Sequence, residues 1–205
     1  MKHTVRQRNF RLLKKADNKG LVCLALERAR IYTQDYPDSV KGWLIYAESL
    51  CSLAHYSEAL RAARRALFVC PLNHQNRPFI YLHIGRIHEH NGKPITALLW
   101  YRKAVKTQPD DAGHRIYLGG LLASMGRLTE AAKVHRRATR CKRGCIDEAH
   151  LNLGLVLRAQ RKYKEAIQSF RKALQIDPNY QEAKKELKDV EATIDFLRDT
   201  QPVGS

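Results

Sequence analysis

The sequence predicts an all-α protein, a solenoid of about five helical hairpins followed by one capping helix. The main observation is a period of close to 34 residues, because the same residue types recur around Gly85, Gly119 and Gly154. A second observation is a proline near the end of most periods, as at Pro109 and Pro178, where proline would end a helix. The third is an apolar stripe at helical spacing in the last segment.

The period divides residues 6–180 into a repeat domain of five frames. The repeat pattern places a small residue midway along the first helix and an alanine early in the second, so that two antiparallel helices approach closely. The first frame has Leu13 at the position of the small residue, and the fourth has His135 where a large aromatic is expected. The frames are 6–39, which is degenerate, then 40–73, 78–111, 112–145 and 147–180.

The two ends of the chain lie outside the repeats. Residues 1–5 are expected to be a basic N-terminal tail, and residues 200–205 a disordered tail. Residues 181–199 are expected to form the capping helix that closes a solenoid. Its apolar stripe runs through Ala183, Leu187, Val190, Ile194 and Leu197.

The last frame resembles the tetratricopeptide repeat. The matching residues are His150, Leu153, Gly154, Leu157, Tyr163, Ala166, Phe170, Ala173 and Pro178. The resemblance extends in variant form to the other frames, and implies a right-handed solenoid that covers nearly the whole chain. It further implies a concave groove, lined by the first helix of each hairpin, that binds an extended peptide or a partner helix.

Carrying the groove positions of that family over by alignment gives a mixed and partly basic set. It consists of Lys14, Lys41, Ile45, Glu48, His83, Arg86, Tyr117, Asn152 and Arg158. The dicarboxylate clamp known in the family is not reproduced, because Ile45 and His83 stand in its windows, and an asparagine ladder is represented by Asn152 alone. A groove of unknown peptide specificity remains, and the alternative is a solvated inner face that only keeps the chain soluble.

The chain is strongly basic, with 37 Lys and Arg against 20 Asp and Glu and a formal net charge of +17. This excess favours acidic protein partners or other anionic surfaces. Lys133, Arg136, Arg137 and Arg140 have the spacing of one helix face. The predicted anionic-surface contacts are Arg61, Arg64, Arg65, Lys133, Arg136, Arg137, Arg140, Lys142 and Arg143.

Two classes of binding function therefore follow. The first is an adaptor or scaffold that docks a protein segment in the groove. The alternative is an RNA- or ribosome-associated protein that contacts phosphate through its N-terminal and convex basic surfaces, with strong salt dependence. Against the alternative, the sequence has no known RNA-binding motif, and aromatic residues do not alternate with the basic ones.

No metal, cofactor or catalytic group is predicted. His135, Cys141, Cys145 and His150 could complete a zinc shell, but their spacing is not a recognised one and packing explains them more simply. The sequence has no phosphate-binding glycine loop, nucleophile elbow or metalloprotease helix, so we expect no enzyme.

The expected cellular compartment is inferred from the absence of targeting signals in the sequence and from its cysteines. No apolar run reaches the length of a membrane span, and the charged N-terminus does not lead into a signal peptide. The odd number of cysteines, five, suits a reducing compartment. The expected location is cytoplasmic.

Overall fold

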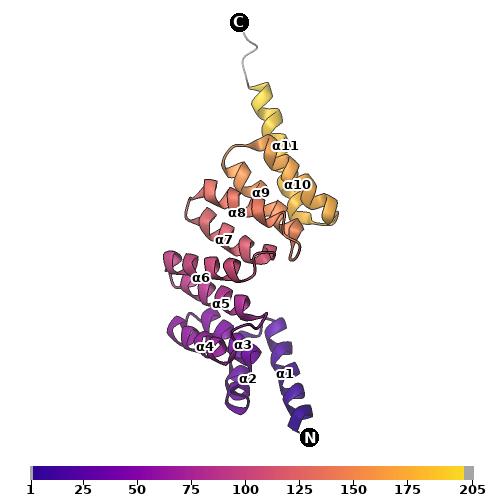
Figure 1. The fold of residues 1–205 in the computed structure, drawn as a ribbon. Helices are drawn as coiled ribbons and strands as arrows, with labels where there is room; N and C mark the ends of the chain where they lie inside the picture. The colour runs from indigo at the N-terminus through magenta and orange to yellow at the C-terminus, as the bar shows by residue number, and fades with distance from the viewer. Residues whose placement is uncertain (1, 201–205) are drawn as a thin grey trace. The chain divides into compact units, whose positions relative to one another are not determined.

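The structure is a computed structural model that describes residues 2–200, and these residues form eleven helices and no strand (Figure 1). The predicted all-α class is confirmed. The helices are α1 (Lys2–Asn18), α2 (Val22–Asp35), α3 (Val40–Ser52), α4 (Tyr56–Val69), α5 (Arg77–His90), α6 (Pro94–Thr107), α7 (Ala112–Ser124), α8 (Leu128–Ala138), α9 (Ile146–Ala159), α10 (Tyr163–Ile176) and α11 (Gln181–Asp199).

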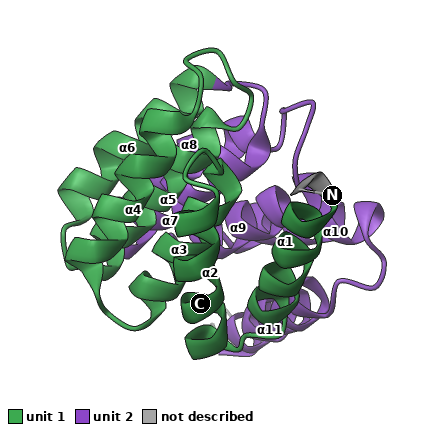
Figure 2. Cartoon of the chain, turned by 90° about the horizontal axis from the view of Figure 1, so that it is seen from below, with its two compact units in different colours: residues 1–107 green, residues 108–205 purple. Residues whose placement is uncertain are grey.

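The chain divides into two compact units, residues 1–107 and 108–205 (Figure 2). In each unit every helix packs on the next one along the chain. In the first unit α3 also contacts α1 and α5, and in the second α9 also contacts α7 and α11. We call these odd-numbered helices the inner helices, and the even-numbered ones the outer helices.

The ends of the chain differ in part from the expected boundaries. The first helix begins at Lys2, so residues 2–5 belong to α1 rather than to a separate tail. The segment expected to cap the repeats is the single helix α11, which packs on α10 and contacts α9. Of the expected tail 200–205, residues 201–205 lie outside the described residues.

Each of the last three hairpins is held by a glycine on the inner helix against a ring on the outer helix. A Cβ atom added at these glycines would lie 2.4–2.5 Å from the nearest ring atom, so no larger residue fits without movement. The rings are 0–1 % exposed. The pairs are Gly85 with Tyr101, Gly119 with His135, and Gly154 with Phe170.

The first two hairpins use different residues at the same two repeat positions. Leu13 and Ala29 belong to one buried cluster, and Ala47 and Ala63 belong to another. All four side chains are fully buried. Leu13 is thus matched by the smaller Ala29, while Ala47 and Ala63 are two small residues of equal size. Both combinations keep the helices close at native packing density.

Proline sets where most of the outer helices end. Helices α2, α4, α6 and α10 each end two residues before a proline: Pro37, Pro71, Pro109 and Pro178. The residue before a proline is disfavoured in the α conformation, so the helix stops there.

Helix α8 lacks such a proline and ends early, at Ala138. The loop that follows is held to the start of α7, where the Ala112 N–H donates to the Arg143 carbonyl oxygen at 2.9 Å. The predicted continuous basic helix face is therefore wrong at its last member, because Arg140 lies beyond the end of the helix.

We predict that Gly119→Ala destabilises the protein by about 1–3 kcal/mol, since its Cβ would overlap the His135 ring. Gly120→Ala is the matched control in the same helix. Gly120 is exposed and has no atom within 4 Å of an added Cβ, so this change should raise stability by up to about 1 kcal/mol. Urea unfolding of both variants measures the difference, and equal effects would contradict the contact.

His135→Phe should remove a pH dependence of stability. Burial lowers the pKa of His135 from 6.5 to about 4. Between these two pH values His135 is protonated in the unfolded chain and neutral in the folded chain. The stability lost as pH falls from about 6.5 to about 4 should reach about 3 kcal/mol. Unfolding free energies of the wild type and the variant at pH 7.5 and 4.5 check this, and parallel pH profiles would refute it.

Candidate functional site

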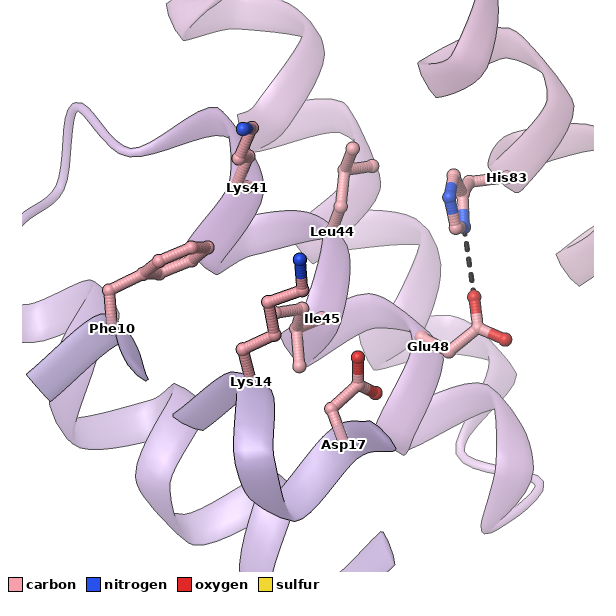
Figure 3. Close-up of a pocket in the computed structure, with 8 residues that line it drawn as sticks. All are labelled: Phe10, Lys14, Asp17, Lys41, Leu44, Ile45, Glu48 and His83. Carbon is pink, nitrogen blue, oxygen red and sulfur yellow. Dashed lines mark ion pairs between the residues drawn. The ribbon is translucent and has the colours of Figure 1, made fainter. Parts of the chain in front are cut away.

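The inner helices of the first unit line an open pocket of about 400 Å³ (Figure 3). Helix α1 contributes three side chains, α3 four and α5 one. The pocket is lined by Phe10, Lys14, Asp17, Lys41, Leu44, Ile45, Glu48 and His83. It therefore combines apolar surface with groups of both charges.

Glu48 is the best-connected polar group of the pocket. Nδ1 of His83 lies 3.0 Å from its carboxylate, and Arg86 donates a hydrogen bond to the other oxygen. Burial alone would raise the pKa of the Glu48 carboxyl, but the bond from His83 and the charge of Arg86 lower it to about 2. The α5 end of the pocket thus holds a carboxylate whose charge is already paired.

The α1 side of the pocket has a different character. Lys14 and Lys41 are exposed, and neither forms an ion pair with another described residue. Burial and the negative charge of Glu48 raise the pKa of the Asp17 carboxyl. Phe10 packs its ring 5.6 Å from that of Tyr32, which fixes the apolar wall.

The structure brings together five of the nine groove residues expected from the sequence. Lys14, Lys41, Ile45, Glu48 and His83 line the one pocket. Arg86 does not line it but binds Glu48.

Three lining residues were not on the expected list: Phe10, Asp17 and Leu44. Each lies three or four residues from an expected one in the same helix. Helical spacing from Lys14 and Glu48 was therefore the signal that could have identified them.

The other expected groove residues lie in the second unit and have different surroundings. Asn152 donates to the Glu148 carbonyl oxygen at 2.9 Å. Arg158 forms ion pairs with Glu186 and Asp189 of the capping helix. Tyr117 is 42 % exposed on α7. Arg158 thus serves at least to hold α11.

The predicted basic surface lies mainly on outer helices. Arg61, Arg64 and Arg65 are exposed on α4, with the Arg65 guanidinium 5.1 Å from the Phe68 ring centroid. On α8 Lys133 and Arg137 are exposed, while Arg136 lies 3.4 Å from Glu165. Lys142 and Arg143 lie in the loop after α8.

The zinc hypothesis gains no support from the geometry. His135 is 1 % exposed and fills the contact with Gly119. Residues 2–200 contain no group of three or more His, Cys, Asp or Glu that could hold a metal ion. In the same part of the chain no helix is long and apolar enough to cross a membrane.

Comparison with known proteins adds family and fold. A family model described as tetratricopeptide repeat matches residues 147–180, and a second one with the same description matches residues 84–144. Among solved structures, the C-terminal part of a TPR repeat-containing protein from Cytophaga hutchinsonii has a TM-score of 0.71 at 18% identity. The alignment covers 95% of this chain and 74% of that chain.

The chain is a tetratricopeptide-repeat protein. Two human relatives are the protein O-mannosyl-transferase TMTC1, 30% identical over 60% of this chain and 12% of its own, and tetratricopeptide repeat protein 7A, 31% identical over 66% and 15%. This tetratricopeptide-repeat chain spans less than a fifth of the length of the curated relatives it matches. Its fold is typically non-catalytic and supports a protein–protein interaction scaffold.

Glu48→Gln should destabilise this tetratricopeptide-repeat protein at neutral pH, because His83 and Arg86 lose their ionised partner. The wild type should lose up to about 3 kcal/mol as pH falls from about 4.5 toward about 2, since the depressed pKa of Glu48 favours the folded state only while the carboxyl is ionised. Urea unfolding between pH 7 and 3 measures this, with Glu58→Gln, whose side chain on α4 is 46 % exposed, as control. Identical slopes for all three proteins would contradict the assignment.

Proposed function

We propose that the chain is a non-catalytic interaction scaffold in which the pocket between α1, α3 and α5 binds a segment of an acidic partner protein. The observation that carries the proposal is the gathering of Lys14 and Lys41 around one pocket of about 400 Å³ with an apolar wall. Small-ligand and peptide sites have this volume and this mixture of apolar lining with a few polar groups.

Charge argues for an acidic segment. Glu48 is already paired with His83 and Arg86, so it offers little repulsion to an incoming carboxylate. Lys14 and Lys41 retain their charge for a ligand, because neither has an ion-pair partner among the described residues. An acidic side chain would pair with these lysines, while an apolar neighbour contacts Phe10, Leu44 and Ile45.

The proposal also covers the cellular compartment and the lack of catalytic activity. All five cysteines are free, which supports a reducing compartment such as the cytoplasm. The mannosyl-transferase relative is matched over 12% of its length, and we propose no transferase activity for this chain.

The test is selection of a random twelve-residue peptide library on the full chain, followed by fluorescence anisotropy of the enriched peptides. We expect enrichment in Asp and Glu, and at least tenfold weaker binding by the Lys14→Glu, Lys41→Glu double variant. Lys15→Glu, on the same helix and outside the pocket lining, should change affinity by less than threefold. Peptides that bind the double variant as well as the wild type would refute the site.

Arg86 is not a suitable probe of this pocket. Its replacement would also remove one of the two partners of Glu48 and so alter stability. Lys14 and Lys41 are exposed and form no ion pair with another described residue. The lysine variants therefore separate binding from folding.

The second candidate function is phosphate contact with RNA or the ribosome. It is favoured by Arg61, Arg64 and Arg65, which are exposed and form no ion pair with another described residue. Replacing all three by Glu should then abolish recovery of RNA from cell extract at 50 mM salt, and the wild-type recovery should fall steeply by 200 mM. Unchanged recovery in the variant would exclude this surface.

A further inference from the structure

A second cavity, of about 360 Å³, lies within the second unit between the outer helices α8 and α10 and the inner helix α9. It shares no residue with the pocket of the first unit. Its charged and polar lining includes Arg136, Arg140, His150, Glu165, Gln168 and Lys172. We call it the outer cleft.

The outer cleft has an excess of positive charge. Three of its lining residues are cations, Arg136, Arg140 and Lys172, and one is a carboxylate, Glu165. Arg136 lies 3.4 Å from Glu165. Arg140 and Lys172 form no ion pair with another described residue. With His150 neutral, the formal charge of the lining is three minus one, or about +2.

This excess arises from the local sequence. No acidic residue occurs from Ala131 to Cys145, so nothing within the segment can neutralise its arginines. Arg140 follows the end of α8 at Ala138 and lines the cleft together with Arg136, while Arg137 lies on α8 and does not line it. Like charges gathered in this way repel one another unless an anion is present.

His150 adds a buried nitrogen atom, Nδ1, that lacks a hydrogen-bond partner among the described residues. Burial and the positive charge of Lys172 lower the pKa of His150, so the ring is neutral at pH 7. A buried polar atom without a partner is uncommon and is consistent with a site that a ligand completes.

We propose that the outer cleft binds the phosphate group of a phosphomonoester. A monoester carries a charge of about −1.5 to −2 at pH 7, which complements the net charge of the lining. Guanidinium groups bind phosphate oxygens through paired, charge-assisted hydrogen bonds, and Arg136 and Arg140 converge on the cavity with Lys172 on the facing helix.

The geometry distinguishes this ligand from a nucleic-acid backbone. The cations converge on one cavity rather than forming an extended row, and no Phe, Tyr or Trp side chain lines the outer cleft to stack a base. A phosphodiester also carries a single charge, which would leave part of the positive lining uncompensated.

Titration of the full ¹⁵N-labelled chain with inorganic phosphate at pH 7.5 and constant ionic strength tests the proposal. We expect saturable NMR shifts in the backbone signals of residues 136–150, with a dissociation constant in the millimolar range. Arg140→Ala and Lys172→Ala should each weaken binding at least tenfold. Arg137→Ala, which removes the same charge from a neighbouring exposed position outside the cleft, should change it less than twofold.

Three outcomes would overturn the proposal. The first is no saturable shift up to 20 mM phosphate. The second is equal weakening by Arg137→Ala and Arg140→Ala, which would indicate diffuse surface charge. The third is equal affinity for dimethyl phosphate, a phosphodiester, which would indicate a reader of RNA backbone. All three residues are exposed, and thermal unfolding of the variants verifies their fold.

Two further probes identify the source of the phosphate. Glycerol 3-phosphate represents a free metabolite, and vesicles containing phosphatidylinositol 4-phosphate represent a lipid headgroup, with phosphatidylglycerol vesicles as the diester control. Binding of either monoester probe, lost in Arg140→Ala, supports the cleft. Equal retention on both kinds of vesicle argues against it.

Discussion

The contact between the two helices of each hairpin is the constraint on which the rest of this structure depends. In three hairpins a glycine admits a ring from the partner helix, and an added Cβ would come within 2.4–2.5 Å of that ring. In the other two, the same repeat positions hold Leu13 with Ala29 and Ala47 with Ala63, each pair within one buried cluster. The combined size of each pair, rather than either residue, keeps the helices at packing distance.

The pocket of the first unit is a consequence of that packing. Each outer helix packs closely on its inner helix, and the inner helices also contact one another: α1 contacts α3, and α3 contacts α5. Side chains on their remaining faces then converge, so Lys14 from α1, Lys41 from α3 and His83 from α5 share one cavity. The pairing of Glu48 with Arg86 joins α3 to α5 directly.

Periodicity made the helices and their contacts predictable, because the small residue, the ring and the proline each have a local steric effect. Helix α8 ends at Ala138 although its frame has Arg143 instead of a helix-ending proline, so this boundary could not be predicted from the repeat pattern. The pairing of Arg158 with Glu186 could not be predicted, since residues 28 positions apart meet only through tertiary packing. For the same reason, the sequence could not predict that Arg140 and Lys172 line one cavity.

The most direct test of the size-matched contact is a double-mutant cycle at Gly154 and Phe170. Gly154→Ala introduces an overlap and Phe170→Ala a cavity, so each alone should destabilise the protein by more than about 1 kcal/mol. The double variant recreates the alanine pair found at Ala47 and Ala63. We predict that it is at least 1 kcal/mol more stable in urea unfolding than the sum of the single changes implies. Strict additivity would contradict the account.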